Sequence, residues 1–500
     1  MSQSSASHPH RLHTAEHLAH VADVVVVGCG AAGASAAISA AEAGASVLVL
    51  EAASAGGGTT AMAGGLIYMG CGTPVQKACG FSDTPEAMYE YLIRASGPNA
   101  DPERVRLYVD GSLAHYEWLL AQGMVFKHEY YAKKNTNTPG DQCLIYTGNE
   151  ACTGFAEYAA PAPRGHKGQA MGEGGGSMLM EKLIASATAK GVRILCDTRA
   201  RSAIVDDTGS VIGIVARSEG RDILIGARRG VVLCAGGFIM NTEMVSRHAP
   251  WLQNHTTLNG NPNDDGSGIR IGLGAGGAAM NMNEGFVCLP FYPPASFVQA
   301  IMVDSRGQRF INEDCYHGRM GEAILKRYPE RHFMIVGAEH MGDFNRPPLG
   351  GFNVMATGDT SEELESELGM ASDTLAHTIR IYNRHAQEGS DPLFRKHPDY
   401  VRPLEPPYAA CEVTPGSGAF FPVFTLGGLR ARATGEVLDE EGSAVPGLFS
   451  AGRNSCGLPR SGAGYSSGMS IGDATFFGRL AGRSAAESPV RSMTPGATAG

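Results

Sequence analysis

The chain contains 500 residues, of which 43% are hydrophobic and 18% charged, a composition typical of a large globular protein with a buried core. The 40 basic and 50 acidic residues leave a net charge of −10 without a basic stripe, which excludes nucleic acid as a partner. No apolar run is long enough for a membrane span and the N-terminus lacks the pattern of a secretory signal, so we expect a cytoplasmic location.

Two further features of the composition concern cysteine and glycine. The eleven cysteines are odd in number, dispersed and never arranged as paired CxxC motifs, which indicates free thiols and no metal site. The 67 glycines are nearly twice the ordinary usage of about 7%, yet they show no Gly-X-Y period. Collagen is therefore excluded, and the glycine excess needs a local explanation.

Both ends of the chain are predicted to be disordered tails. Residues 1–20 contain His8, His10, His13, His17 and His20, which allows either a metal-binding tract or a mobile tail. We prefer the tail because nothing in this segment fixes the imidazoles in space. Residues 484–500 are rich in Ser, Ala, Pro and Gly and are predicted as the second tail.

The first ordered segment has the pattern of a β-α-β unit. Residues 24–27 are consecutive valines, which is typical of a strand buried on both faces of a parallel sheet. The motif GCGAAG follows at residues 28–33, and an alanine-rich helical stretch continues to residue 43. A second buried strand is expected at residues 47–50, directly before Glu51. This order of strand, GxGxxG, helix, strand and acid predicts dinucleotide binding.

Each residue of the motif has a mechanical role in that prediction. Gly28 permits the tight turn, Gly30 lets the backbone approach a pyrophosphate, and Gly33 allows the helix to pack closely on the sheet. Glu51 is placed to accept hydrogen bonds from ribose hydroxyls. Residues 272–277 also match GxGxxG, but no strand precedes them and no β-α-β unit follows, so they are interpreted as helix packing and a turn.

The middle of the chain gives weaker signals. Helices are expected at 104–122 and 179–191, a strand at 192–196, and an antiparallel layer from strands at 203–215 and 222–225 with a turn at 206–209. Five aromatic residues lie between these elements and form either core or pocket wall: Tyr130, Tyr131, Tyr146, Phe155 and Tyr158.

Glycine also gathers in segments that are far apart in sequence. The cluster at 56–65 is either a flexible surface loop or a bare backbone suited to the edge of a flat heterocycle. Similar segments occur at 230–237, which is expected to be a short buried strand that runs into glycines, and at 427–429, 447–453 and 464–468. Convergence of several such segments on one extended cofactor would account for the glycine excess.

Taken in order, these motifs resemble the fumarate reductase and 3-ketosteroid dehydrogenase group of FAD flavoproteins. The similarity extends from residue 24 to residue 481. The motifs that carry it, besides GxGxxG and Glu51, are GGTT at 57–60 with Gly64 and Gly65, LCAGG at 233–237, NDDGSG at 263–268, RFINE at 309–313, TLGGL at 425–429 and VPGLFSAG at 445–452.

The resemblance implies an α/β fold with a Rossmann-like FAD-binding domain of the glutathione reductase type and an inserted α+β catalytic cap domain. It implies domains at 21–285 and 424–483 for the two parts of the FAD-binding domain and at 286–423 for the cap. It also implies non-covalent FAD. The residues expected to bind it are Gly28, Gly30, Ala32, Gly33, Glu51, Ala52, Gly58, Thr59, Thr60, Gly64, Gly65, Ala235, Gly236, Gly237, Asp265, Gly452, Arg453, Ser470 and Ile471.

Departures from the dicarboxylate reductases of the group narrow the expected substrate. Where those enzymes carry arginines for a substrate carboxylate and for proton donation, this chain has Tyr465 and His317. The resemblance therefore disfavours fumarate and favours an apolar neutral ketone, which we expect to be a steroid. The segments RNS at 453–455 and GYSSG at 464–468 most resemble the 3-ketosteroid Δ4-(5α)-dehydrogenases and lack the prolines of the Δ1-dehydrogenases. A Δ1-dehydrogenase or another FAD-dependent reductase or desaturase of a neutral ketone is the alternative.

Desaturation of a 3-keto-5α-steroid removes a proton from C4 and a hydride from C5, and the resemblance assigns three residues to this task. Tyr465 is expected to donate to the ketone oxygen, Ser467 to contact the C4 proton, and Tyr316 to accept that proton as a phenolate or as a relay. His317 is expected to point elsewhere if its segment is extended. The blander interpretation is that these residues are hydrogen-bonded structural residues.

Three points remain open at this stage. Arg453 pairs either with a cofactor phosphate or with a neighbouring carboxylate. GYSSG also satisfies the GxSxG motif of serine esterases, but no histidine follows His397, so the required chain order is absent. A non-catalytic FAD-binding protein is the second alternative, and the sequence does not define the electron acceptor.

Overall fold

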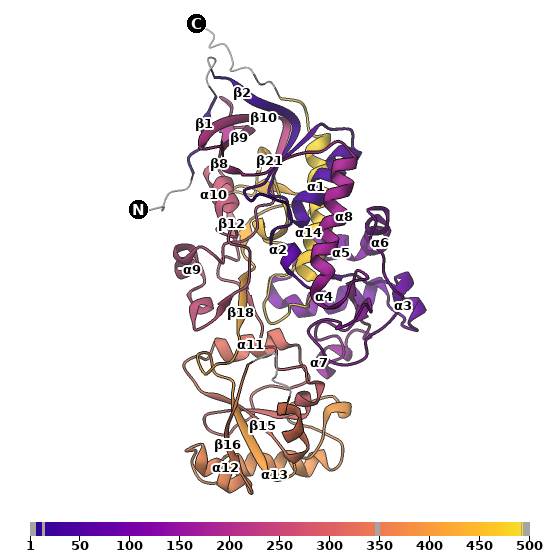
Figure 1. The fold of residues 1–500 in the computed structure, drawn as a ribbon, viewed down its shortest axis with the longest axis vertical. Coiled ribbons are helices and arrows are strands. Elements are labelled where there is room, and N and C mark those ends of the chain that lie inside the picture. Colours follow the sequence, from indigo (N-terminus) through magenta and orange to yellow (C-terminus); the bar gives the residue numbers. More distant parts are fainter. Residues whose placement is uncertain (1–6, 13–15, 346–350, 492, 494–500) are drawn as a thin grey trace.

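The computed structural model describes residues 7–12, 16–345, 351–491 and 493. The chain forms a large lobe that contains both terminal regions and a smaller lobe built from residues near 290–420, drawn in salmon and orange in Figure 1. This is the α/β fold with an inserted second unit that the sequence predicts.

A sheet with a parallel centre organises the large lobe. Five strands lie in the order β21-β10-β2-β3-β7, and all neighbours in this run are parallel. Val24 and Val26 belong to a core shared with the helices, whereas Val25 and Val27 belong to the core on the opposite face. The uninterrupted valine run is therefore explained by burial on both faces. The strands are β2 (Leu18–Val27), β3 (Val47–Leu50), β7 (Arg193–Leu195), β10 (Arg221–Leu233) and β21 (Ala444–Ser450).

The helices α1 (Ala31–Glu42), α8 (Gly175–Ala189) and α14 (Met469–Glu487) lie beside one another over one face of this sheet (Figure 1). Small residues bring α1 and α14 into close contact: a Cβ at Gly482 would lie 2.0 Å from the carbonyl oxygen of Ala36. The two helices begin at the same end of the sheet as a result.

An antiparallel layer extends the same sheet, as predicted. β8 (Thr198–Val205) and β9 (Val211–Ser218) pair in antiparallel fashion around the turn at 206–209, and β9 pairs with the first half of β10. The separate strands expected at 222–225 and from 230 are one continuous strand, β10. Because β10 changes partners along its length, with a register shift between Ala227 and Gly230, the sequence pattern divides it into two.

Several predicted boundaries require correction. The helix expected at 104–122 is broken at Gly111 into α5 (Pro102–Asp110) and α6 (Ser112–Ala121), where a Cβ would lie 2.5 Å from the ring of Phe476. The helix expected at 179–191 already begins at Gly175 and ends at Ala189. Residues 272–277 lie at the end of α10 (Ser267–Gly274) and in the following turn, as interpreted.

The prediction of a disordered tail at residues 1–20 is wrong for part of this segment. The backbone of β1 (His10–Arg11) pairs with β8, and β2 begins at Leu18 because its first residues pair with the long β10. Likewise, α14 continues to Glu487, and the backbone N–H of Arg491 donates to the carbonyl of Arg228. Within the two predicted tails, residues 1–6, 13–15, 492 and 494–500 lie outside the described residues.

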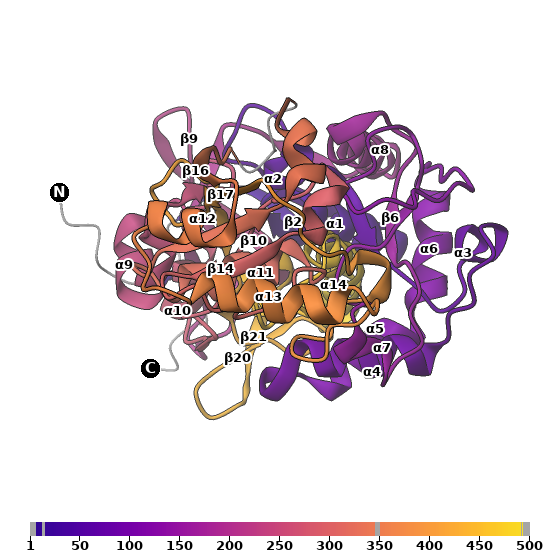
Figure 2. The ribbon, with the colours of Figure 1, turned by 90° about the horizontal axis from the view of Figure 1, so that it is seen from below.

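A helical region lies beside the large sheet, on one side of the molecule in Figure 2. It contains a small sheet in the order β4-β6-β5. Its elements are α3 (Pro74–Ala78), α4 (Pro85–Ser96), α5, α6, α7 (Thr153–Ala156), β4 (Leu66–Tyr68), β5 (Leu144–Ile145) and β6 (Gly165–Lys167).

The smaller lobe, called the cap below, has a four-stranded sheet in the order β14-β15-β17-β16 with its own apolar core. The chain passes to and from the cap through β13 and β18, which pair in antiparallel fashion, and the boundaries proposed at 286 and 423 fall within these two strands. The elements are β13 (Gly285–Val287), β14 (Ile301–Asp304), α11 (His317–Leu325), β15 (His332–Val336), β16 (Val354–Gly358), α12 (Ser361–Glu367), α13 (Leu375–Ala386), β17 (Tyr408–Glu412) and β18 (Pro422–Thr425).

Short elements complete the chain. The remaining helices and strands are α2 (Gly58–Met62), α9 (Thr242–His248), β11 (Thr257–Leu258), β12 (Ala279–Met280), β19 (Gly428–Leu429) and β20 (Glu436–Leu438). The 3-10 helices are η1 (Gly97–Asn99), η2 (Gly172–Gly174), η3 (Pro250–Gln253), η4 (Ala295–Gln299), η5 (Ala338–Asn345), η6 (Pro398–Tyr400) and η7 (Gly452–Asn454).

Candidate active site

A cavity of about 440 Å³ extends from the carboxyl ends of β2, β3 and β10 to the start of α11 in the cap. Both lobes contribute to its wall, since Glu51 and Gly452 come from the large lobe and Tyr316 from the cap. The carboxyl ends of parallel strands are the usual ligand site of an α/β sheet.

The three glycines of the GxGxxG motif have different surroundings. Gly28 has a φ of 98°, and a Cβ there would lie 2.5 Å from the carbonyl oxygen of Cys234. A Cβ at Gly33 would lie 1.9 Å from the carbonyl oxygen of Gly28, so this residue serves packing and does not line the cavity. At Gly30 the nearest atom to a Cβ would be 3.9 Å away, and the position faces the cavity. Among the three glycines of the motif, Gly30 is thus the one at which a Cβ would point into the cavity without a close protein neighbour.

Glu51 lies at the end of β3 and is 7% exposed. Its two carboxylate oxygens accept hydrogen bonds from the backbone N–H groups of Cys29 and Ala53, both at 2.8 Å. The carboxylate also lines the cavity. Its remaining lone pairs can accept hydrogen bonds from hydroxyl groups of a ligand.

Two helices begin at the cavity wall. Ala31 and Ala32 belong to the first turn of α1, and Ser470 and Ile471 to the first turn of α14. The unpaired backbone N–H groups and the dipoles of helix N-termini favour negative charge on a ligand.

Arg453 pairs with a carboxylate of the protein. Its Nη2 lies 2.8 Å from Oδ2 of Asp264, and the same oxygen accepts a hydrogen bond of 2.6 Å from Thr59. The structure thus supplies the neighbouring carboxylate that the sequence left as one of two options.

Asp265 does not line the cavity, and its neighbour Asp264 does. The carboxylate of Asp265 turns the other way: Oδ1 accepts from the backbone N–H of Ser267, and Oδ2 lies 3.1 Å from Nη1 of Arg199. Gly237 is also outside the cavity wall, because it packs against Thr425, whose Oγ1 would lie 2.6 Å from a Cβ. The resemblance implies that both residues bind the cofactor directly. In the structure they instead contact neighbouring protein groups behind the cavity wall.

The three predicted catalytic residues lie together at the cap end of the cavity. The hydroxyls of Tyr316 and Ser467 share a hydrogen bond of 2.7 Å. The hydroxyl of Tyr465 donates to Oγ of Ser470 at 3.0 Å and accepts from the backbone N–H of Ser470 at 3.3 Å. All three line the cavity, and the two tyrosines are 2% and 5% exposed.

Burial determines the protonation of these tyrosines. Loss of hydration raises the pKa of the Tyr316 phenol well above its usual value, and the neighbouring Cys288 and Tyr465 raise it further, whereas the hydrogen bond to Ser467 lowers it. Burial also raises the pKa of Tyr465. The phenolate form considered for Tyr316 is therefore disfavoured, because burial penalises the charged form. A neutral phenol that relays a proton fits the geometry.

The wall around these hydroxyls is aromatic and apolar. The rings of Phe286 and Tyr465 have centroids 4.5 Å apart, and those of Phe286 and Phe424 lie at 4.8 Å. Phe286, Phe424 and Cys288 line the cavity and come from β13 and β18 or from the residue that follows β13. These residues are not predicted from the sequence, because a strand of three or four residues is too short to show an alternation of polar and apolar residues that would mark one face as a pocket wall.

His317 also lines the cavity, contrary to expectation, because its segment is not extended: Tyr316 is the N-cap of α11 and His317 its first residue. Nδ1 of His317 lies 2.7 Å from the thiol of Cys288. Burial, together with the charge of Lys134, lowers the pKa of His317 to about 3, so its imidazole is neutral.

The serine of the GxSxG motif has no hydrolase surroundings. Ser466 is fully buried, and its hydroxyl bonds to Tyr91 at 2.9 Å. A nucleophilic serine needs exposure and an adjacent general base. The structure therefore agrees with the chain order in excluding an esterase.

The geometry sorts the expected cofactor residues into two groups. Gly33, Gly237 and Asp265 lie outside the cavity wall, as described above. The expected cofactor residues that line the cavity are Gly28, Gly30, Ala32, Glu51, Ala52, Gly58, Thr59, Thr60, Gly64, Gly65, Ala235, Gly236, Gly452, Arg453, Ser470 and Ile471. The cavity wall also contains residues that are not predicted from the sequence: Arg199, Asn261, Asn263 and Asp264. Only Asn263 and Asp264 belong to a recognised motif, NDDGSG at 263–268.

Three further features of the described chain concern its cysteines, its histidines and its helices. All eleven cysteines are unpaired, and no group of histidine, cysteine and carboxylate side chains within the described residues is arranged to hold a metal ion. Among the five N-terminal histidines considered as a metal-binding tract, His13 lies outside the described residues. In the part of the chain that the structure describes, no helix combines the length and the apolar character needed to cross a bilayer.

Comparison with known proteins identifies relatives that match most of the chain. The family described as FAD binding domain matches residues 23–464. A fumarate reductase (cytochrome) of Shewanella frigidimarina is 29% identical over 479 residues, which are 93% of this chain and 77% of that protein. A 3-oxo-5-alpha-steroid 4-dehydrogenase of Comamonas testosteroni is 27% identical over 86% of this chain and 92% of its own length.

Among solved structures, the 3-ketosteroid-Δ4-(5α)-dehydrogenase of Rhodococcus jostii RHA1, in complex with 4-androstene-3,17-dione, superposes with a TM-score of 0.92. It is 41% identical, and the match covers 96% of this chain and 100% of that one.

Proposed function

Because this chain belongs to the FAD-binding family of flavoproteins and is an FAD-dependent oxidoreductase acting on CH–CH bonds, we propose that it converts 3-keto-5α-steroids to 3-keto-4-ene steroids. The observation that carries the proposal is the hydrogen-bonded pair Tyr316–Ser467 beside Tyr465 in an aromatic wall. The similar Rhodococcus enzyme, solved with a steroid ketone, supports the substrate class.

The cavity fits FAD on observations of this structure. Gly30 presents bare backbone where a Cβ would find open space, Glu51 offers a fixed carboxylate, and α1 and α14 point their N-termini at the cavity. We propose that Gly30 and the start of α1 hold the pyrophosphate, that Glu51 holds the ribose, and that the start of α14 faces the flavin ring. When bound, FAD would supply the acceptor for the hydride that leaves C5 of the substrate.

Ser467 and Tyr316 would take the other hydrogen. The C4–H bond is acidified by the neighbouring ketone, so this hydrogen leaves as a proton. A serine hydroxyl alone is a weak base, but its hydrogen bond of 2.7 Å to Tyr316 would allow a relay. Ser467 would take the C4 proton and give its own proton to the phenol oxygen, and the phenol would give its own proton to water in the cavity that Tyr316 lines. This relay needs no tyrosinate, in agreement with the raised pKa of Tyr316.

Tyr465 is placed to stabilise the developing enolate. Its oxygen accepts a hydrogen bond from the backbone N–H of Ser470 at the start of α14, which makes its own O–H a better donor. The proton that Tyr465 gives to Ser470 Oγ in this structure can turn to a ketone oxygen in the cavity. Because burial raises the pKa of Tyr465, the group remains a donor at neutral pH.

The charge of the cavity wall argues against a dicarboxylate substrate. Two arginines line the cavity, Arg199 and Arg453, and each pairs with an aspartate, at 3.1 Å and 2.8 Å. No lysine belongs to the wall, whose residues are all described. A dianion would therefore find no unmatched cation, and the aromatic surroundings of Tyr465 favour a neutral ketone.

Anaerobic reduction of the flavin tests the proposal. Addition of a 3-keto-5α-steroid to the yellow protein without oxygen should bleach it in one turnover, and an added dye should restore the colour as electron acceptor. Chromatography of the product separates a 4-ene from a 1-ene, so a 1-ene product would replace the Δ4 assignment by Δ1. Yellow protein that no 3-ketosteroid bleaches would contradict the function and favour a non-catalytic FAD protein or a reductase of another neutral ketone.

A further inference from the structure

The Tyr316–Ser467 hydrogen bond joins two lobes of the protein, so the relative position of the two residues needs a support. Tyr316 precedes α11 of the cap, and Ser467 lies in the loop before α14 of the large lobe. The same short segment of the helical region, residues 147–150, contacts the backbone of both.

The contacts of this segment are specific hydrogen bonds. The backbone N–H of Ser467 donates to the carbonyl oxygen of Thr147 at 2.9 Å. The backbone N–H of Tyr316 donates to Oδ1 of Asn149, also at 2.9 Å. Since only Gly148 separates the two residues that supply these acceptors, they fix the distance between the two catalytic backbones.

Asn149 supplies an acceptor that α11 itself does not provide. Tyr316 is the N-cap of α11, and the N–H groups at a helix start have no partner within the helix. Asn149 is fully buried, and its own backbone N–H donates to the hydroxyl of Tyr91 at 2.9 Å. The side chain and the main chain of Asn149 thus link Tyr316 to Tyr91.

Tyr91 closes the connection to the second catalytic loop. Its hydroxyl also bonds to Oγ of Ser466, the neighbour of Ser467, at 2.9 Å. Gly148 makes this possible, because a Cβ there would lie 2.0 Å from Ser466 Oγ and 2.4 Å from the Tyr91 hydroxyl. No side chain other than hydrogen fits between the segment and the loop.

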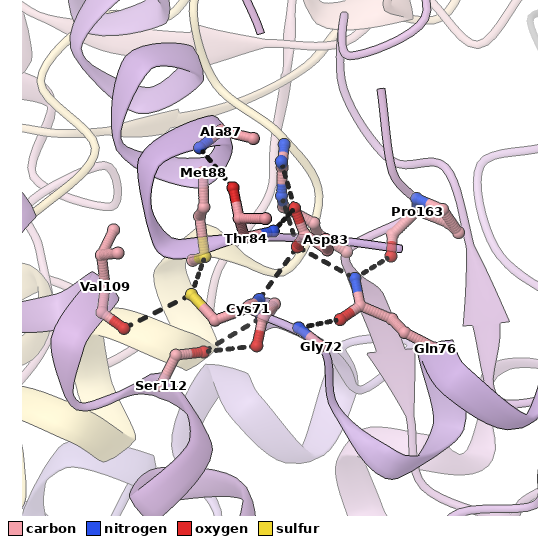
Figure 3. A network of polar contacts seen from close by, with 12 residues as sticks. Cys71, Gly72, Gln76, Asp83, Thr84, Ala87, Met88, Val109, Ser112 and Pro163 are labelled. Carbon is pink, nitrogen blue, oxygen red and sulfur yellow. Dashed lines mark hydrogen bonds and ion pairs between the residues drawn. The ribbon is translucent and has the colours of Figure 1, made fainter. Parts of the chain in front are cut away.

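The ring of Tyr91 lies against Arg164, which belongs to a buried polar network. Figure 3 shows the part of this network around Asp83. The guanidinium of Arg164 lies 5.5 Å from the centre of the Tyr91 ring and binds both oxygens of Asp83, at 2.7 and 3.1 Å. Asp83 also accepts hydrogen bonds from the backbone of Cys71 and the side-chain amide of Gln76. The anchor of the segment is therefore a rigid, charge-matched part of the core.

We propose that Asn149 is a positioning residue that holds Tyr316 in hydrogen-bond contact with Ser467, an inference that rests on the proposed function. Asn149 does not line the cavity, so it acts on substrate only through Tyr316. Displacement of a reacting group by about 1 Å can lower turnover about 100-fold. Removal of the Asn149 acceptor should consequently affect kcat more than KM.

A double-mutant cycle tests this role. Asn149→Ala should lower kcat about 10- to 100-fold with little change in KM and in FAD content, and Asn149→Asp, which keeps an acceptor oxygen, should recover most of the turnover. In a Ser467→Ala background, Asn149→Ala should cause no further loss because the partner of Tyr316 is already gone. An equal loss in both backgrounds would overturn the proposal and indicate a general structural effect.

A structural measurement separates this inference from the proposed function. In the crystal structure of Asn149→Ala, the Tyr316 and Ser467 hydroxyls should lie beyond hydrogen-bond distance, and an unchanged 2.7 Å would overturn the proposal whatever the substrate is. Wild-type protein that fails to turn over a 3-ketosteroid would contradict the function alone.

Asn383 offers a control, because its half-buried amide bonds twice to the backbone of Leu404 in the cap, away from the cavity. Asn383→Ala should lower the melting temperature without changing the Tyr316–Ser467 distance. If Asn149→Ala does not fold, Tyr91→Phe serves instead: it removes the hydroxyl that links Asn149 to Ser466 and should lengthen the same distance with a smaller loss of kcat. Unchanged geometry and kcat in Tyr91→Phe would then overturn the proposal.

Discussion

Tyr316 and Ser467 are 151 positions apart in sequence, and their hydroxyls lie 2.7 Å apart at the boundary of two lobes. One hydroxyl comes from the first residue before a cap helix and the other from a glycine-flanked loop of the large lobe. The site therefore exists only when the lobes are in contact, and a change at the boundary should alter catalysis before it alters FAD binding.

Loss of the Tyr316 hydroxyl should interrupt the proton relay. We expect Tyr316→Phe to slow anaerobic flavin reduction by about 10²- to 10⁴-fold, the usual contribution of a general acid or base, while FAD stays bound. Stopped-flow absorbance of the flavin gives the rate directly. Tyr382→Phe is the matched control, because Tyr382 is a buried cap tyrosine with a hydroxyl that has no hydrogen-bond partner. Similar rates in wild type and Tyr316→Phe would remove Tyr316 from the mechanism.

Tyr465→Phe should remove the donor to the ketone oxygen. The expected loss of kcat is about 10²- to 10³-fold, as for other oxyanion donors, and the protein should remain yellow. Because burial raises the pKa values of both Tyr465 and Tyr316, neither phenol should produce a falling limb of kcat just above neutral pH. A pH–rate profile between pH 6 and 9 checks this point, and retained activity in Tyr465→Phe would assign the donor elsewhere.

The sequence predicts the features that depend on residues close together in the chain, and it does not predict those that depend on contacts between distant residues. The valine run at 24–27 and the motif at 28–33 report local burial and local turns, and the β-α-β unit follows from them. The continuity of β10 depends on exchange of partner strands, which leaves no periodic signal. The partner of Arg453 is likewise a residue 189 positions away, Asp264.

The cap side of the site shows the same limit. The family resemblance predicts that Tyr316 lies near the substrate, but it does not predict that the helix beginning at His317 turns that imidazole into the cavity wall. Phe286 and Phe424 become neighbours only because β13 and β18 pair where the chain enters and leaves the cap. Such contacts are set by topology, whereas residue types alone indicate only that the aromatic side chains prefer burial.

Acid should destabilise the protein through two buried histidines. Burial lowers the pKa of His166 to about 4 and that of His317 to about 3, against 6.5 in an unfolded chain. Between these values the unfolded state binds more protons than the native state, so stability falls as the pH decreases from about 6.5 towards 4. The full effect of His166 is on the order of 3 kcal/mol.

Urea unfolding at several pH values between 7.5 and 5 measures this slope. His166→Gln should give a weaker dependence on pH than wild type, whatever its absolute stability, because one titrating group is gone. The neutral imidazole of His166 contacts Thr73 and the carbonyl of Arg164, so some loss of stability at pH 7.5 is expected as well. An identical slope in both proteins would show that His166 is not responsible.

An added methyl group should weaken FAD binding at Gly30 and lower the stability of the apoprotein at Gly33. Gly30 has a φ of −87°, which alanine adopts readily, and a Cβ there would meet no protein atom closer than 3.9 Å. We expect Gly30→Ala to fold with a melting temperature close to that of wild-type apoprotein but to bind FAD at least about 10-fold more weakly, because the methyl group occupies the place of the pyrophosphate. At Gly33 a Cβ would lie 1.9 Å from the carbonyl oxygen of Gly28, so Gly33→Ala should destabilise the apoprotein itself by a few kcal/mol. Flavin fluorescence titration and thermal unfolding of both apoproteins separate the two effects. Tight FAD binding by Gly30→Ala would move the pyrophosphate away from the helix start, and a stable Gly33→Ala apoprotein would contradict its assignment to packing.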